Sequence, residues 1–135
     1  MFVELERSTR SAPASPVIDA FSDRLTSILG EDEDVGIAAI TASELLHGVH
    51  RANAERRTRR EAFVEAVLAT FPILPFDLLV ARVHARLWAT LAAAGADVGA
   101  HDRIVAATAM AAGWRVATGN MRHFEPIAGL DAVQV

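Results

Sequence analysis

Two acidic residues stand where a folded α/β chain could place them around one site. Glu44 follows the apolar run Val35–Ile40 and falls in the first turn of a helix expected to open at Thr41. Asp102 stands at the mouth of a second expected helix, Ile104–Ala112, whose residues are nearly all apolar. Mg²⁺ and Mn²⁺ prefer carboxylate oxygens and water as ligands. The two acids are therefore candidate ligands of a divalent cation.

Thr118 and Asn120 extend this candidate site. The apolar helix that ends at Gly113 must be buried on every face, and the run Arg115–Thr118 after it is typical of a buried strand. In open α/β sheets, ligands bind beyond the carboxyl ends of the strands. The sequence places Thr118 and Asn120 at such an end, so chemistry is expected there.

Each acid also has a purely structural interpretation. Thr41–Glu44 fits the capping box, in which a glutamate reaches back to a free backbone N–H at the start of a helix. Asp102 fits an N-cap or a first-turn acid, which the helix dipole favours. Spacing alone favours capping for both residues, and capping and metal binding can coexist.

Composition narrows the class of protein. The chain has 135 residues, 52% of them hydrophobic, which indicates one folded domain over residues 1–135. No uninterrupted apolar run is long enough to span a membrane, and the N-terminus is unlike a secretory signal. Without cysteine there is no disulfide and no thiolate zinc site. The net charge of −4 argues against nucleic-acid binding driven by overall charge, although a local basic surface is allowed.

Helical and strand patterns alternate along the chain. This alternation predicts an α/β domain with a short parallel sheet and helices on both faces. The expected helices are a stub at Met1–Arg7, Val17–Leu29, a helix opening at Thr41, Ala54–Phe71, Asp77–Ala94 and the apolar helix from Asp102 to Ala112. The expected strands are Val35–Ile40, Phe71–Pro75, Trp114–Thr118 and Ala132–Val135.

A basic cluster and a histidine pair have two interpretations each. Five of the 13 basic residues fall within ten positions, and they either form a solvated helix face or line an entrance for phosphates: Arg51, Arg56, Arg57, Arg59 and Arg60. His47 and His50 share a helix face near Glu44, but surface or core positions explain them better than metal binding.

Four segments, taken in order, resemble the PIN-domain ribonucleases, and in particular the VapC-type toxins of bacterial toxin–antitoxin pairs. The segments are Ala39–Gly48, Gly99–Ala109, Val116–Phe124 and Ile127–Leu130. Together with the stretches between them, they span most of the chain, from Ala39 to Leu130. The resemblance implies a three-layer α/β/α fold and a metal-dependent endoribonuclease.

The resemblance also assigns roles and partners. It implies that Glu44 and Asp102 hold Mg²⁺ or Mn²⁺ and that Asn120 and Thr118 support the same catalytic pocket. It implies a cytoplasmic protein with an RNA substrate, a cognate antitoxin and a second copy of itself as partners. The apolar faces of the expected helices Val17–Leu29 and Leu78–Leu91 are candidate contact surfaces for such partners.

Two departures from the family touch the chemistry. The family opens with a central strand that ends in an aspartate, and here Met1 stands where that motif should just have ended. We therefore expect the strand and its acid to be missing, as after a start placed too far downstream. Many relatives also carry an acid where His123 stands, and His123 is either a weak metal or phosphate contact or, more simply, a solvated surface histidine.

Two other functions remain open at this stage. A domain without its first acid could bind an antitoxin or RNA without cutting it. A flavodoxin-like regulatory or small-molecule domain is the weaker alternative, since no glycine-rich phosphate loop supports it.

Overall fold

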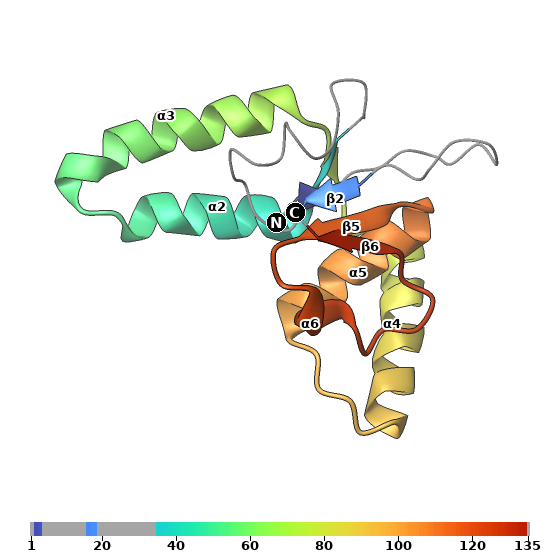
Figure 1. Cartoon of the computed structure of the whole chain (residues 1–135). Helices are drawn as coiled ribbons and strands as arrows, with labels where there is room; N and C mark the ends of the chain where they lie inside the picture. The colour runs from blue at the N-terminus through green and yellow to red at the C-terminus, as the bar shows by residue number, and fades with distance from the viewer. Residues whose placement is uncertain (1, 4–15, 19–34, 135) are drawn as a thin grey trace.

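The structure is a computed structural model that describes residues 2–3, 16–18 and 35–134 (Figure 1). Strands and helices alternate over most of this length. Along the chain they are β1 (Phe2–Val3), β2 (Pro16–Ile18), β3 (Ile37–Ala38), α2 (Ala39–Arg51), α3 (Ala54–Thr70), β4 (Ile73–Leu74), α4 (Leu78–Ala93), α5 (Ala100–Ala112), β5 (Arg115–Thr118), α6 (Met121–Phe124) and β6 (Ala132–Gln134).

Four short strands form the main sheet in the order β1-β2-β5-β6. β2 runs parallel to β5, with Ile18 opposite Ala117, and β5 runs parallel to β6. β1 is antiparallel to both β2 and β5. The carboxyl ends of β2 and β5 consequently meet at one edge of the sheet, which is the edge where a ligand is expected.

A second pair of strands carries a helical hairpin. β3 and β4 pair in parallel, and α2 and α3 lie between them in the chain and pack against each other. Figure 1 shows this hairpin projecting away from α4 and α5. The hairpin matters for function because Glu44 lies on α2 and the arginine cluster lies mostly on α3.

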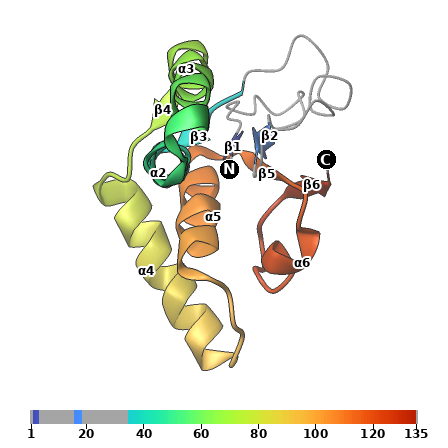
Figure 2. The ribbon, with the colours of Figure 1, turned by 90° about the vertical axis from the view of Figure 1, so that its left-hand side faces the viewer.

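Helix α5 is the centre of the core. Its residues Val105–Ala109 are buried, because α5 packs against β5 on one side and α4 on another. Figures 1 and 2 both show α4 running beside α5. The helix ends at Gly113, whose φ of +77° closes the last turn as the Trp114 N–H donates to the Ala109 carbonyl.

The structure corrects the expectation that the first central strand is missing. β2 is an inner strand of the main sheet, parallel to β5. A β-branched pair, Val17 and Ile18, after a proline at the first strand position suits an extended segment. The predicted helix therefore cannot begin at Val17, and its continuation to Leu29 lies outside the described residues.

Smaller differences concern element ends and exposure. The helix predicted at Met1–Arg7 is wrong where the chain is described, because Phe2–Val3 is β1. The predicted strand Val35–Ile40 shrinks to two residues, since α2 already begins at Ala39. Leu78, at the start of the apolar face named as a candidate contact surface, is 67% exposed. No helix of the described residues is long and apolar enough to cross a membrane.

Candidate active site

Glu44 reaches the site from the second turn of α2. The helix begins at Ala39, and no side chain caps its N-terminus at Ala38. Thr41 is therefore already inside the helix and fully buried, so the predicted capping box does not form. The Glu44 side chain is instead turned outward, where its Oε1 lies 2.6 Å from Nδ1 of His101 on α5.

Asp102 lies in the first turn of α5, and Gly99 takes the N-cap position. The prediction of a first-turn acid is thus confirmed, and the N-cap alternative for Asp102 is wrong. Its side chain is only 15% exposed, and its Oδ2 lies 3.2 Å from Nδ1 of His123. Arg103 holds the preceding loop, since its Nη1 donates to the Val98 carbonyl at 2.6 Å.

The electrostatics of Asp102 tie it to Glu44. The pKa of Asp102 is raised above its ordinary value, first because burial disfavours the carboxylate. The His123 imidazole opposes this shift, whereas the negative charge of Glu44 adds to it. Glu44 also contacts α5 next to Asp102, since its Oε1 lies 2.6 Å from Nδ1 of His101. A bound cation would relieve both the burial and the repulsion.

His123 is a partly exposed histidine beside Asp102, which agrees with the surface interpretation, and its role as a metal or phosphate contact stays a prediction. Its side chain is 56% exposed, as expected of a surface histidine, yet it also contacts the Asp102 carboxylate. It reaches the site from α6, the short helix that follows β5. His101 plays the matching part toward Glu44. The remaining pair, His47 and His50, lies exposed on α2, in agreement with the surface interpretation.

Thr118 and Asn120 lie at the carboxyl end of β5, as expected. Thr118 is fully buried, and its Oγ1 accepts the backbone N–H of Asn120 at 2.9 Å. This bond shapes the turn that leads from β5 into α6. Asn120 is the N-cap residue of α6, yet its side chain makes no capping hydrogen bond and is exposed at this edge.

One candidate acid escaped the sequence analysis. Asp19 directly follows β2 in the sequence and lies itself outside the described residues. β2 ends at the same sheet edge as β5, because Ile18 lies opposite Ala117. The signal was a β-branched strand followed by an aspartate, at residues 16–19. The resemblance to the family instead implied that this motif ends before Met1.

The described residues alone do not form a complete metal-binding set. Over residues 2–3, 16–18 and 35–134, no three His, Asp or Glu side chains converge so as to hold a metal ion. Glu44 and Asp102 nevertheless suit a cation by their chemistry: they are two coupled carboxylates, one of them largely buried. Such a pair fits Mg²⁺ or Mn²⁺, which complete their coordination with water.

A groove lined by arginines adjoins Glu44. A cavity of about 650 Å³ between α2 and α3 is lined by Glu44, Leu45, Gly48, Arg56, Arg59, Arg60, Phe63 and Val64. Three of these residues, Gly48, Arg56 and Arg60, also line a second cavity of about 490 Å³. Part of the arginine cluster thus lines a concave surface beside Glu44, and the entrance for phosphates stays a prediction.

Comparisons with known proteins agree with this architecture. Residues 16–130 match the PIN domain family, and the match begins at β2. Ribonuclease VapC1 of Rickettsia felis is 38% identical over 100 residues, which cover 73% of this chain and 75% of that protein. The tRNA(fMet)-specific endonuclease VapC of Salmonella typhimurium is 34% identical over 94 residues, 70% of each chain.

A solved structure extends the likeness to the fold. A member of the VapBC family of toxin–antitoxin systems from Mycobacterium tuberculosis, VapBC-5, superposes with a TM-score of 0.77 at 28% identity. The superposition covers 91% of this chain and 100% of that one. The chain therefore belongs to the PIN-domain family and has the VapC ribonucleases as its relatives.

Proposed function

We propose that this protein is an endoribonuclease that hydrolyses RNA phosphodiester bonds with the help of a divalent metal ion, and that it is the toxin of a toxin–antitoxin pair. One observation carries the proposal. Glu44 of α2 contacts His101 of α5 at 2.6 Å, which sets it beside the largely buried Asp102, the next residue along α5. The proposed reaction, RNA cleavage, is taken from the VapC relatives, which are named as a ribonuclease and a tRNA-specific endonuclease.

In this proposal Glu44 and Asp102 hold Mg²⁺ or Mn²⁺, and Asp19 is the third carboxylate. When bound there, such an ion would lower the pKa of water and would stabilise the charge that develops on the phosphate. His101 and His123 orient the two described carboxylates through their Nδ1 atoms. Asn120 offers an exposed amide at the rim, on a turn fixed by Thr118.

The partners follow from the same family. VapBC complexes among the structural relatives support a cognate antitoxin as the partner of this chain. We propose RNA as the substrate, a homodimer as the working form and the cytoplasm as the place of action. The alternative of an inactive binding module rested on a missing first strand, and β2 removes that motivation.

RNA cleavage tests the proposal. Purified protein is incubated with a single-stranded oligoribonucleotide and with initiator tRNA, in EDTA, Mg²⁺ or Mn²⁺. We expect cleavage with either metal and none in EDTA. Asp102→Asn and Asp19→Asn should each abolish cleavage, because a neutral amide is a much poorer Mg²⁺ ligand than a carboxylate.

The matched control is Asp97→Asn, an exposed acid in the loop before α5. It should cleave like the unmodified protein. Full cleavage by Asp102→Asn would contradict the metal role of that residue. Absence of cleavage by the unmodified protein on every RNA tested would favour the binding module instead.

A further inference from the structure

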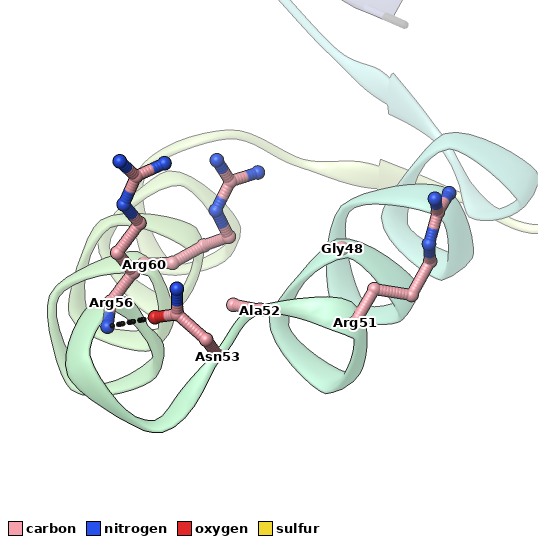
Figure 3. Close-up of a pocket in the computed structure, with 6 residues that line it drawn as sticks. All are labelled: Gly48, Arg51, Ala52, Asn53, Arg56 and Arg60. Carbon is pink, nitrogen blue, oxygen red and sulfur yellow. Dashed lines mark hydrogen bonds between the residues drawn. The ribbon is translucent and has the colours of Figure 1, made fainter.

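The cavity of about 490 Å³ near the tip of the α2–α3 hairpin is strongly basic. It is lined by Gly48, Arg51, Ala52, Asn53, Arg56 and Arg60, without any acidic residue. Figure 3 shows Arg51 on the α2 side and Arg56 and Arg60 on the α3 side, with their guanidinium groups turned the same way. Three positive charges thus face one open space.

The hairpin itself does not neutralise these charges. No described residue forms an ion pair or a side-chain hydrogen bond with the guanidinium group of Arg51, Arg56 or Arg60. Arg57 differs, because its Nη2 donates to the Ala52 carbonyl at 3.0 Å and so ties the end of α2 to α3. Arg57 is structural, whereas the other three guanidinium groups have no such partner among the described residues.

Local geometry keeps the groove open. At Gly48 the missing side chain leaves the floor bare, since a Cβ there would lie 3.5 Å from Nη1 of Arg60. Asn53 caps α3 by accepting the Arg56 backbone N–H with its Oδ1, which turns its amide nitrogen toward the arginines (Figure 3). The groove therefore offers hydrogen-bond donors on both sides and in between.

Two of the groove's arginines also lie near Glu44 and near an aromatic ring, Phe63. Arg56 and Arg60 also line the cavity of about 650 Å³ that reaches Glu44. Phe63 lines this same cavity and is 48% exposed. An arginine track beside an exposed aromatic ring suits a single-stranded nucleic acid, because arginines contact its phosphates and the ring stacks on a base.

We propose that the α2–α3 groove binds the backbone of single-stranded RNA, with Arg51, Arg56 and Arg60 on phosphates beyond the bond that is cut and Phe63 stacked on a base. The groove thereby holds the strand so that a nearer phosphate meets Glu44 and Asp102. This inference rests on the proposed ribonuclease function, and its test is made independent of cleavage.

Binding is measured by fluorescence anisotropy of a fluorescein-labelled single-stranded oligoribonucleotide in EDTA, over a series of salt concentrations. Each phosphate contact contributes about −0.7 to the slope of log affinity against log salt. The variant Arg56→Gln/Arg60→Gln should flatten this slope by about 1.4 and bind more weakly. Adding Arg51→Gln should flatten it by about 0.7 more.

The matched control removes two charges from another helix at the same spacing. Arg82→Gln/Arg86→Gln changes two exposed arginines of α4 and should leave the slope as it is. Phe63→Leu should weaken binding by roughly fivefold or more without changing the slope, because stacking carries no charge. Circular dichroism and thermal unfolding confirm that each variant is folded.

Two results would overturn the inference. One is an equal slope for Arg56→Gln/Arg60→Gln and the unmodified protein. The other is unchanged RNA binding while the same variant loses affinity for the antitoxin, which would assign the groove to an acidic protein segment. If the slopes change as expected but the protein does not cleave RNA in Mg²⁺, RNA binding by the groove is supported and the ribonuclease proposal fails.

Discussion

At the scale of single residues, the candidate site contains an acid, Asp102, whose position lowers folding stability. Asp102 keeps a carboxylate in a largely buried position, near a second negative charge on Glu44. His123 offsets this cost in part, since the net effect is still a raised pKa for Asp102. A position that is unfavourable for folding and favourable for a cation is typical of a functional site.

This cost predicts how Asp102→Asn depends on pH. A raised folded-state pKa means that the protonated carboxyl suits the fold, so its stabilising contribution is present at acid pH and is lost as pH rises through that pKa. In metal-free buffer Asp102→Asn should therefore be at least as stable as the unmodified protein at neutral pH. Its advantage should shrink as pH falls and Asp102 takes up a proton.

Urea unfolding in EDTA at neutral and acid pH measures this difference. Adding Mg²⁺ should raise the unfolding midpoint of the unmodified protein and leave Asp102→Asn unchanged, because a ligand stabilises only the state that binds it. A clear loss of stability in Asp102→Asn at neutral pH would show that the carboxylate serves the fold rather than a metal.

Thr118 is a residue whose hydroxyl serves the turn. It is fully buried and accepts the Asn120 backbone N–H at 2.9 Å. Thr118→Val keeps the shape but removes the acceptor, which should cost roughly 1–3 kcal/mol of unfolding free energy. Thr90→Val, on the exposed face of α4, is the control and should change little. Equal stability of both variants would show that the hydroxyl does not hold the turn.

At the scale of elements, local pattern predicted the helices and the buried strand that carry the described site. The apolar run that became α5 and the strand β5 were predictable, because a helix apolar on all faces has to be covered. Glu44 and Asp102 were singled out by their places at helix starts. Ala54–Thr70 also formed a helix close to its predicted limits.

The two N-terminal strands were not predictable from pattern. β1 has two residues and β2 has three, which is too short to show the alternation of a strand. β3 and β4 are equally short, but each lies within a longer apolar run that predicted a strand. Such short segments form strands because they pair with distant segments, as Ile18 of β2 pairs with Ala117 of β5. For this reason the pattern did not reveal β2 or the aspartate that follows it, Asp19.

Gly48 offers a prediction on helix α2. Glycine inside a helix costs backbone entropy, and here a Cβ would lie at an ordinary contact distance of 3.5 Å from Nη1 of Arg60. Gly48→Ala should therefore raise the unfolding free energy by roughly 0.5–1 kcal/mol. Thermal and urea unfolding measure this change, and a destabilised Gly48→Ala would mean that the hairpin needs the space at this position.

At the scale of the whole molecule, the site lies where two bodies of structure meet. The α2–α3 hairpin supplies Glu44 and the arginine groove, and α5 with α6 supplies Asp102 and His123. α2 also packs against α5, which brings the two acids together. A substrate bound along the hairpin would therefore extend to Glu44 and Asp102.

The homodimer stays a prediction, and the surface of α4 allows it to be tested. Leu78, Leu79 and Trp88, all on α4, are more than half exposed, and a contact between copies is one way to cover such apolar side chains. Sedimentation velocity should show a dimer for the unmodified protein and a shift toward monomer for Leu78→Glu/Leu79→Glu. A monomer at high micromolar concentration in the unmodified protein would contradict the prediction.

The most direct test of the central claim is to locate the metal. Crystals soaked in Mn²⁺ are measured for anomalous diffraction, which identifies the ion independently of activity. We predict a peak within direct coordination distance of carboxylate oxygens from both Glu44 and Asp102, and its loss in crystals of Asp102→Asn. Bound Mn²⁺ elsewhere, with none between these two residues, would contradict the account.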